Sequence, residues 1–514
     1  MRVVKVTGRS LTLDQVVQVA RQGREVCIDG RALESVAAGR SVVERVTESG
    51  IPAYGINTGF GALCDTAISL DQLGRLQQNL VRSHAVGVGP LLSEAQVRAG
   101  MLLRLNSLCV GHSGVRPEVP QLLAGMLNRS VHPRVFAQGS LGASGDLAPL
   151  AHLALVTLGE GEATFQGELL PGGEALTRAG LQPLILEAKE GLALLNGTSF
   201  LAGLGALACW DALQLVAVAG AAAALSLEAW GGGVAAYGRE LMATRPHPGS
   251  VLVAGQLRAL LAGRKTEQGP GKLQDPYSFR CVPQVHGAAL DAALQTERVL
   301  TVELNSATDN PLVLDGRIVS GGNFHGQPVG LAMDYLGLGL AALAGIAERR
   351  VDQLLNPALS GLPAFLVTAP GLNSGWMIAQ YTAASLVNEN RMLAAPASVH
   401  SIPVSANQED YVSMATLAAR KAGEMVANAQ VVLAIELLVA AQALDIRFRR
   451  EARRPAELGR GTRVIYSLVR ERVPYLEEDR YLQPDVGAIT ELLRSGILLD
   501  NLEREIGVFP TLRD

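Results

Sequence analysis

The sequence predicts a mainly α-helical protein, and three observations support this fold class. Hydrophobic residues make up 48% of the 514 residues but aromatic residues only 4%, so alanine and leucine, which favour helices, carry most of the apolar share. Long stretches of the chain contain no proline, as long helices require. Strand-like patterns are few. We therefore expect a helical core with a few short β-hairpins.

The first 200 residues predict a loop-rich region. Glycine-rich segments such as YGINTGFGAL (54–63) and GSLGASGD (139–146) separate short helical patterns, and GEATFQGELLPGG (161–173) is typical of a hairpin. We expect a loop-rich N-terminal domain over residues 1–200 and a long-helix bundle domain over residues 201–514. No linker or repeat marks the boundary, which is therefore soft.

The remainder of the chain predicts long helices. No proline occurs between Pro183 and Pro246, between Pro328 and Pro357, or between Pro403 and Pro455. In the last interval, apolar residues recur at steps of three and four and should share one helix face: Met414, Leu417, Ala418, Ala422, Met425, Ala429 and Val432. The segment LVLDGRIV (312–319) contains an Asp-Gly pair suited to a two-residue hairpin turn.

Composition excludes several classes of function. The formal charge of −4 gives no general attraction to phosphate, so we expect no nucleic acid partner. A group of arginines between residues 447 and 463 is interleaved with a single aromatic, Phe448, and is better explained as a solvated or subunit-contacting face. The apolar stretches at 191–210 and 212–227 are expected to be buried helices rather than membrane spans.

The cysteines and the N-terminus indicate a cytoplasmic protein. The five cysteines are scattered and form no C-x-x-C pair, which fits a reducing compartment. The first residues show no secretory signal pattern. The chain contains neither a phosphate-binding G-x-x-x-x-G-K-[ST] motif nor the zinc motif H-E-x-x-H, and no metal is expected.

The run Ala143-Ser144-Gly145-Asp146 raises the main chemical question. Its pattern does not fit the G-x-S-x-G of a serine hydrolase. Read alone, it is a tight turn with Asp146 capping the next helix. A different outcome is cyclisation, because Gly145 has no Cβ and its nitrogen can approach the Ala143 carbonyl closely. Loss of water from the ring and from the Ser144 side chain would then give an imidazolinone with an electrophilic methylidene.

Eight motifs together resemble the aromatic amino acid ammonia-lyases, and within that family the histidases. They cover nearly the whole chain: YGINTGFG (54–61), SHAVGVG (83–89), GASGDLAPLAH (142–152), KEGLALLNGTS (189–199), QDPYSFRCVPQVHG (274–287), SATDNPL (306–312), SGGNFHG (320–326) and SANQED (405–410). The resemblance implies that Ala143, Ser144 and Gly145 form 4-methylideneimidazole-5-one without any external cofactor. It also implies a homotetramer whose active sites are completed by neighbouring chains.

The resemblance also suggests roles for individual residues. Arg280 matches the position that binds the substrate carboxylate, and its planar guanidinium suits a bidentate contact, although most arginines form ordinary ion pairs. Tyr54 is the first choice for the base that removes the β-proton, and Tyr277 is its competitor; either could instead be a packed aromatic. Three further residues match positions lining the substrate or electrophile, where a turn or core role is the alternative: Asn196, Gln274 and Phe324.

The expected substrate is L-histidine, which would lose ammonia to give trans-urocanate in the first step of histidine degradation. Ser83-His84 and Glu409 follow the histidase pattern, and a carboxylate can pair with an imidazole but not with a phenyl ring. His84 alone could be a core histidine. Two residues depart from the common histidase pattern, Ser199 and Tyr411, and leave fine substrate preference open.

Two alternatives remain open from the sequence. A tyrosine or phenylalanine ammonia-lyase, or an aminomutase, would use the same prosthetic group. A non-catalytic helical scaffold would keep the glycine loops and Arg280 as structural features only. Product analysis separates the first alternative, and the mass of the intact chain separates the second.

Overall fold

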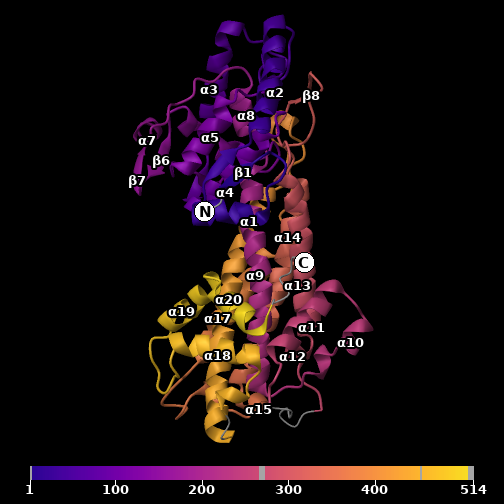
Figure 1. Ribbon diagram of the computed structural model, residues 1–514, viewed down its shortest axis with the longest axis vertical. Helices are drawn as coiled ribbons and strands as arrows, with labels where there is room; N and C mark the ends of the chain where they lie inside the picture. The colour runs from indigo at the N-terminus through magenta and orange to yellow at the C-terminus, as the bar shows by residue number, and fades with distance from the viewer. Residues whose placement is uncertain (1–2, 266–272, 452–453, 508–514) are drawn as a thin grey trace. The chain divides into compact units, whose positions relative to one another are not determined.

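The computed structural model describes residues 3–265, 273–451 and 454–507, and it confirms the mainly α-helical fold class (Figure 1). The chain divides into two compact units, each assembled from three segments. The first unit comprises Met1–Trp210, Thr296–Asp334 and Pro396–Gly423. The second unit comprises Asp211–Gln295, Tyr335–Ala395 and Glu424–Asp514.

The first unit contains short helices, short strands and many loops. Its elements are β1 (Val4–Val6), α1 (Leu13–Gln22), β2 (Val26–Ile28), α2 (Gly30–Ser49), η1 (Gly61–Leu63), η2 (Leu70–Gln72), α3 (Leu73–His84), β3 (Val88–Leu91), α4 (Glu94–Cys109), α5 (Glu118–Asn128), β4 (His132–Pro133), β5 (Phe136–Gln138), α6 (Leu147–Thr157), β6 (Glu162–Phe165), β7 (Glu168–Pro171), α7 (Gly172–Arg178), α8 (Glu190–Leu195), β8 (Leu312–Leu314), β9 (Arg317–Val319) and η5 (Ser405–Asn407). Helix α4 forms the centre of this unit, because every residue from Val97 to Cys109 is buried.

The strands of the first unit form small sheets. β1 pairs in parallel with β2. The other pairs are antiparallel: β3 with β5, β4 with β6, β6 with β7, and β8 with β9. Both predicted hairpins, β6–β7 and β8–β9, are confirmed. In the second hairpin, Asp315 (φ 49°) and Gly316 (φ 74°) occupy the turn, and two positive φ values are what a type I′ turn needs. The β8–β9 hairpin packs beside α2 (Figure 1).

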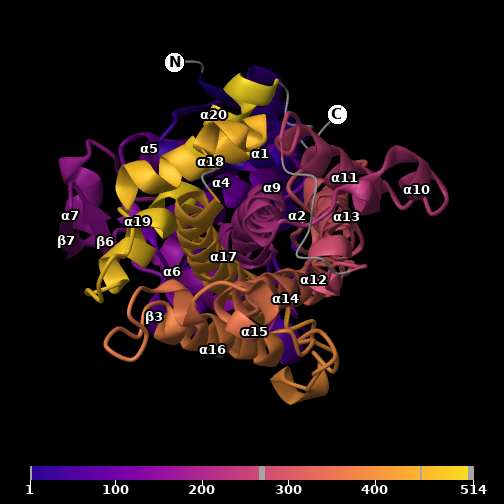
Figure 2. The ribbon, with the colours of Figure 1, turned by 90° about the horizontal axis from the view of Figure 1, so that it is seen from below.

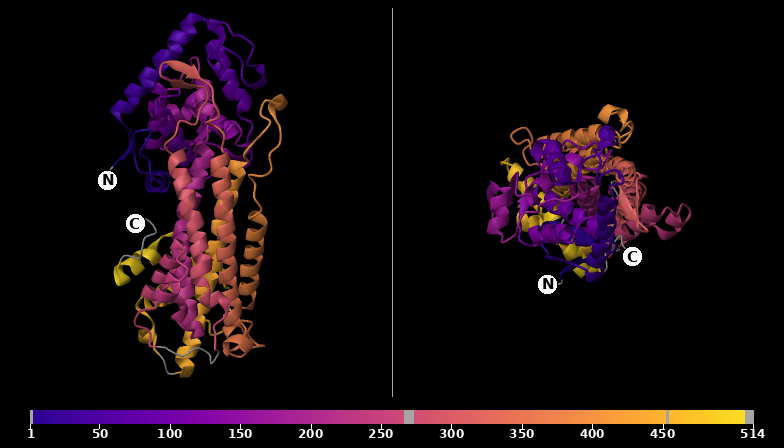
Figure 3. Two further views of the ribbon diagram at one scale, coloured as in Figure 1. Left: turned by 90° about the vertical axis from the view of Figure 1, so that its right-hand side faces the viewer. Right: turned by 90° about the horizontal axis from the view of Figure 1, so that it is seen from above.

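Four long helices contribute residues to both units: α9 (Ser199–Trp230), α13 (Val282–Glu303), α14 (Gln327–Leu355) and α17 (Ala415–Glu451). The three intervals without proline therefore contain long helices, as predicted. Within the second unit these helices run side by side, and α9 and α17 are seen end-on next to each other in Figure 2 and lengthwise in Figure 3. The prediction for the α17 stripe differs from the structure at two residues. Met414 precedes the helix and has a left-handed backbone (φ 50°). Leu417 is 42% exposed, whereas the residues of the stripe from Ala418 onward are buried.

The rest of the second unit consists of shorter helices around these four. They are η3 (Ala235–Tyr237), α10 (Arg239–Ala243), α11 (Pro248–Leu260), α12 (Tyr277–Arg280), α15 (Pro357–Ser360), η4 (Ala364–Leu366), α16 (Met377–Leu393), η6 (Pro455–Glu457), α18 (Arg460–Arg472), α19 (Gln483–Arg494) and α20 (Ile497–Ile506). A buried hydrogen bond from the Ser226 hydroxyl to Glu436 (2.7 Å) ties α9 to α17.

Three helices, α9, α14 and α17, are long and apolar enough to cross a membrane by length and composition. In α9 and α17, however, 83% of the most apolar window is buried inside the protein. Burial within the helical core therefore accounts for their hydrophobicity, as expected for the stretches at 191–210 and 212–227.

Candidate active site

A cavity of about 630 Å³ in the first unit brings together residues that are far apart in the sequence. It lies among α3, the start of α6, the end of α8 and two loops, at residues 59–63 and 405–409. Six residues singled out in the sequence line this cavity: Tyr54, Ser83, His84, Ser144, Asn196 and Glu409. The volume is sufficient for an amino acid side chain and its backbone.

Helix α3 forms one wall. Leu76, Asn79, Leu80 and Ser83 all line the cavity, and steps of three and four residues place them on one face of the helix. Helices α3, α6 and α8 pack against one another, so the walls that they supply support each other.

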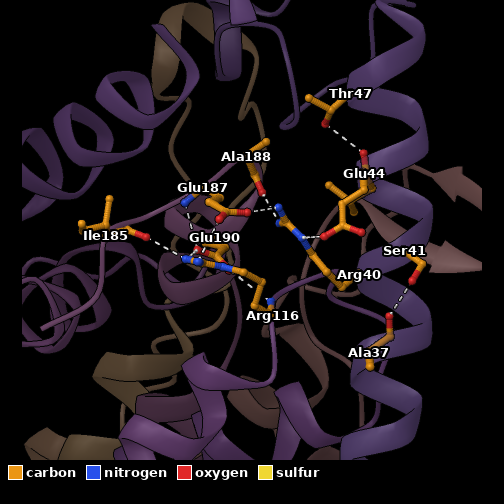
Figure 4. Close-up of polar contacts among 11 residues, drawn as sticks. Ala37, Arg40, Ser41, Glu44, Thr47, Arg116, Ile185, Glu187, Ala188 and Glu190 are labelled. Carbon is orange, nitrogen blue, oxygen red and sulfur yellow. Dashed lines mark hydrogen bonds and ion pairs between the residues drawn. The ribbon is translucent and has the colours of Figure 1, made fainter. Parts of the chain in front are cut away.

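The start of α8 is held by ion pairs and hydrogen bonds of charged side chains (Figure 4). The Arg116 guanidinium donates to both carboxylate oxygens of Glu190 (Nε–Oε1 2.8 Å and Nη2–Oε2 2.7 Å), while Arg40 donates to the Ala188 carbonyl (3.0 Å) and pairs with Glu187. Lys189 pairs with Asp309 at 2.8 Å, and both side chains are almost fully buried. Since α8 has only six residues, these contacts determine where its last turn and the following Asn196 lie.

The turn at residues 142–145 is compressed between two other segments. Gly142 (φ 67°) and Gly145 (φ 74°) both adopt the left-handed conformation. A Cβ on Gly145 would lie 2.1 Å from the Gly197 carbonyl oxygen, so only glycine fits there. The Ser144 carbonyl accepts from the Gly197 amide (3.2 Å) and from Asn196 Nδ2 (3.0 Å). Ser144 itself is half-buried and lines the cavity, so its side chain is accessible to a substrate.

Asp146 does not cap α6 with its side chain, which corrects the simplest interpretation of this turn. Its carboxylate is fully buried and accepts from the Leu201 amide (2.7 Å), the Thr416 hydroxyl (2.9 Å) and the Ser140 hydroxyl (3.2 Å). Burial raises the pKa of Asp146 to about 6 although these hydrogen bonds lower it. Asp146 therefore ties the turn to α9 and α17 instead of stabilising α6.

Tyr54 lies in the loop before η1, where its hydroxyl accepts a long hydrogen bond from the Gly61 amide (3.4 Å). Burial is the main cause that raises the pKa of Tyr54 above its usual value of 10.0, and the nearby Glu409 charge raises it further. The phenol is therefore protonated at neutral pH in this arrangement. Tyr54 lines the same cavity as Ser144 and Glu409.

The imidazole of His84 has a defined tautomer. Its Nδ1 lies 2.8 Å from the Leu80 carbonyl oxygen, and because a carbonyl can only accept, Nδ1 carries the hydrogen. Burial lowers the pKa of His84, so the ring is neutral at neutral pH and Nε2 can accept a hydrogen bond. The Ser83 hydroxyl donates to the same Leu80 carbonyl (3.1 Å), and its oxygen lies 3.0 Å from Nδ1, whose hydrogen it can accept.

Glu409 is presented by a strained loop. Ser405, Ala406 and Asn407 all have positive φ values between 52° and 65°, a conformation that costs non-glycine residues about 1–2 kcal/mol each. The loop is closed by the pair Val404–Glu409, which exchange backbone hydrogen bonds of 2.9 and 3.3 Å. Strain of this kind persists where the surroundings enforce it, commonly at functional sites.

The other candidate residues lie elsewhere. Gln274, Tyr277 and Arg280 belong to the second unit, whereas every residue lining the cavity comes from the first. Tyr277 is 71% exposed, and the Arg280 guanidinium stacks on its ring with Cζ 4.6 Å from the ring centre. Phe324 is half-buried in the loop after β9 and is not among the lining residues.

The two residues that depart from the histidase pattern also lie outside the described cavity lining. Ser199 is buried at the start of α9. Tyr411 is 57% exposed and stacks on His325 with ring centres 6.0 Å apart.

Sequence reasoning missed part of the cavity wall. Phe60, Asn79 and Leu192 line it, as do Ser405 and Ala406. The helical spacing of Leu76, Asn79 and Ser83 could have identified the α3 face. The left-handed backbone at 405–406 had no sequence signal, because serine and alanine rarely adopt it.

Comparisons with known proteins show a likeness over almost the whole chain. The family model for aromatic amino acid lyases matches residues 11–471. A histidine ammonia-lyase from Sorangium cellulosum is 51% identical, covering 97% of this chain and 99% of that protein. The crystal structure of histidine ammonia-lyase from Trypanosoma cruzi has a TM-score of 0.92 and 42% identity, covering 99% and 97% of the two chains. Tyrosine aminomutase from Streptomyces globisporus has a TM-score of 0.94 and 38% identity, covering 98% and 99%.

Proposed function

This chain belongs to the aromatic amino acid lyase family, and we propose that it eliminates ammonia from L-histidine to give trans-urocanate. The observation that carries the proposal is the convergence of Ser144, Tyr54, His84 and Glu409 on one cavity. A serine in a compressed turn, a candidate base and two groups able to bind an imidazole are the parts that this reaction needs.

We propose that Ala143, Ser144 and Gly145 cyclise to 4-methylideneimidazole-5-one, with loss of one water on ring closure and one from the Ser144 side chain. The residues fit this group, because Gly142 and Gly145 have left-handed backbones and a Cβ on Gly145 would lie 2.1 Å from the Gly197 carbonyl oxygen, so the turn requires a residue without a side chain where the ring nitrogen would come from. When formed, the group supplies an electrophile for activating the substrate. Asn196 donates to the Ser144 carbonyl, and this contact supports assigning it the role of orienting the ring.

His84 and Glu409 are the residues that we assign to the substrate ring. The neutral His84 has an Nε2 acceptor, and the Glu409 carboxylate is a second acceptor, so an imidazole N–H group finds partners that a phenyl ring cannot use. Ser83 holds the His84 ring through its hydroxyl. Tyr54 takes the β-proton in this assignment, with Tyr277 as the alternative base.

The substrate carboxylate is assigned to Arg280, with Gln274 and Phe324 as further contacts. We propose a homotetramer in which a neighbouring chain completes each active site. Exposed apolar residues support association, because Tyr335 and Leu338 on α14 and Ile378 and Tyr381 on α16 are 48–66% exposed. We also propose a cytoplasmic location for this assembly.

The test is a product assay with purified protein and L-histidine, L-tyrosine and L-phenylalanine in parallel, together with the mass of the intact chain. The proposal expects ammonia and trans-urocanate from histidine, and a chain lighter than the encoded sequence by two waters. A β-amino acid product would instead identify an aminomutase, and faster ammonia release from tyrosine would identify a different lyase. An active chain of full encoded mass would refute the prosthetic group.

A further inference from the structure

Arg280 and Tyr277 lie on α12, a single helical turn in the second unit. One turn of helix is unstable by itself, because too few hydrogen bonds offset the loss of conformational freedom. The position of the Arg280 guanidinium therefore depends on what holds this turn from outside.

The entry to the turn is fixed by an indole and a backbone amide. Asp275 accepts from Trp230 Nε1 (3.1 Å) and from the Gly233 amide (2.8 Å). Trp230 also stacks on Phe279 with ring centres 5.1 Å apart and an interplanar angle of 19°. Both rings are fully buried, so they anchor the middle of the turn in the core.

The exit from the turn is held by two buried donors. The Tyr237 hydroxyl donates to the Phe279 carbonyl at 2.7 Å, and Arg350 Nη1 donates to the Ser278 carbonyl at 3.3 Å. Arg350 is itself fixed by a fully buried bidentate pair with Glu436. Tyr237 is only 1% exposed, and burial raises the pKa of its phenol, so the hydroxyl remains a donor at all ordinary pH values.

The outward side of the turn is less constrained. Tyr277 is largely exposed, and Arg280 contacts its ring. The Arg280 Nε is buried and, among the described residues, has no hydrogen-bond partner. A guanidinium whose backbone is held by buried neighbours and whose Nε–H has no partner among the described residues is suited to bind a carboxylate.

We propose that Tyr237 is a positioning residue for substrate binding. Its hydroxyl holds the Phe279 carbonyl and thereby fixes the direction in which the next residue, Arg280, presents its guanidinium to the carboxylate of the amino acid. This inference rests on the carboxylate-binding role proposed for Arg280. It adds a residue that never touches the substrate but determines how tightly the carboxylate is bound.

The experiment compares Tyr237→Phe with the wild-type enzyme. Phenylalanine keeps the ring and its packing but leaves the Phe279 carbonyl without its donor, so the turn gains freedom. The KM for L-histidine should rise about tenfold, since displacement of a binding group by a fraction of an ångström has effects of this order. Because only carboxylate binding is weakened, kcat should stay within about twofold of the wild-type value.

Two inhibitors distinguish a specific loss of carboxylate binding from a general disturbance of the active site. Inhibition by trans-urocanate, which has a carboxylate, should weaken about as much as the KM rises. Inhibition by histamine, which has the imidazole and the amine but no carboxylate, should not change. Tyr466→Phe is the matched control, because the Tyr466 hydroxyl, also from the second unit, donates to Asp445 rather than to the turn. The control should leave both inhibition constants unchanged.

A double variant identifies which assumption fails. Arg280→Lys should raise KM, and adding Tyr237→Phe to it should have little further effect, because both changes act on one contact. Full additivity of the two effects, or an unchanged KM in Tyr237→Phe while Arg280→Lys raises it, would overturn the role of Tyr237 and leave the proposed function intact. An unchanged kcat/KM in Arg280→Ala would refute the carboxylate role of Arg280, on which the inference rests.

Discussion

Replacing Gly145 by alanine tests whether the close contact between the 142–145 turn and Gly197 is required for the active enzyme. A Cβ at this position would lie 2.1 Å from the Gly197 carbonyl oxygen and 2.3 Å from its carbon. Since ordinary carbon contacts begin near about 3.5 Å, the two segments would have to separate by roughly 1 Å or more. Two hydrogen bonds would break: Gly197 amide to Ser144 carbonyl and Asp146 amide to Gly197 carbonyl.

The lost hydrogen bonds and the backbone conformation together set the free-energy cost of Gly145→Ala. Each buried hydrogen bond that is lost with its partner left unsatisfied costs about 1–3 kcal/mol. The left-handed backbone at Gly145 adds about 1–2 kcal/mol once a side chain is present. The local cost in free energy is therefore about 3–8 kcal/mol, so we expect the turn to move away from Gly197 in this variant.

Gly167→Ala provides the matched control for the backbone conformation. Gly167 also has a positive φ (82°), in the β6–β7 hairpin, but no atom lies within 4 Å of a Cβ built there. This variant should lose only about 1–2 kcal/mol of stability. It should still lose two waters from its intact mass and keep wild-type turnover.

The assay for both variants combines intact mass, thermal unfolding and steady-state turnover of L-histidine. Gly145→Ala should keep its full encoded mass, and turnover should fall at least about 100-fold, because Ser144 moves by roughly 1 Å. A Gly145→Ala chain that loses two waters and matches the turnover of Gly167→Ala would refute the reasoning.

Three further predictions concern selectivity, pH and stability. Glu409→Gln should lower the histidine-to-phenylalanine ratio of kcat/KM by about 10- to 100-fold, since a charge-assisted hydrogen bond worth about 1.5–3 kcal/mol is lost. Equal ratios in the variant and the wild type would show that Glu409 does not contact the substrate ring. Because burial raises the pKa of Tyr54 and a base must be deprotonated, kcat/KM should keep rising with pH up to and beyond 10.0. The Tyr54→Phe variant should lack this rise. Identical pH profiles in the two enzymes would show that another residue is the catalytic base. Lys189→Met should lower the free energy of unfolding in denaturant titrations by about 3–5 kcal/mol, because Asp309 is left buried and unpaired. The double variant Lys189→Met with Asp309→Leu should recover part of this stability. A larger loss of stability in the double variant would contradict this explanation.

The sequence predicted the long helices well because proline spacing is a direct constraint on the backbone. It did not predict α13, which lies outside the three proline-free intervals. This helix begins at Val282 and includes Pro283, since proline is tolerated in the first turn, where no intrahelical amide bond is lost. Leu417 was predicted to share a helix face with residues that are buried, yet it is exposed, because periodicity predicts a helix face but not what covers it.

The candidate site was predictable where chemistry depends on a local motif. The turn at 142–145 and the His84 and Glu409 segments were identified by their residue types. Contacts between residues that are far apart in the sequence could not be predicted. Asp146, for example, accepts hydrogen bonds from Leu201 and Thr416. The same holds for Tyr237, whose sequence surroundings give no sign that its hydroxyl supports Phe279.

The discontinuous first unit has a consequence for the timing of biosynthesis. Its N-terminal segment ends at Trp210, but its last segment, which carries Glu409 and the Ser413 and Thr416 contacts to the turn, ends only at Gly423. At translation rates of about 5–20 residues per second, roughly 10 to 40 seconds pass between the emergence of these two ends from the ribosome. During that interval the nascent turn lacks part of its surroundings, so the cyclisation proposed for Ser144 would have to wait for the nearly finished polypeptide. A prematurely terminated product would consequently be released without a competent reaction centre.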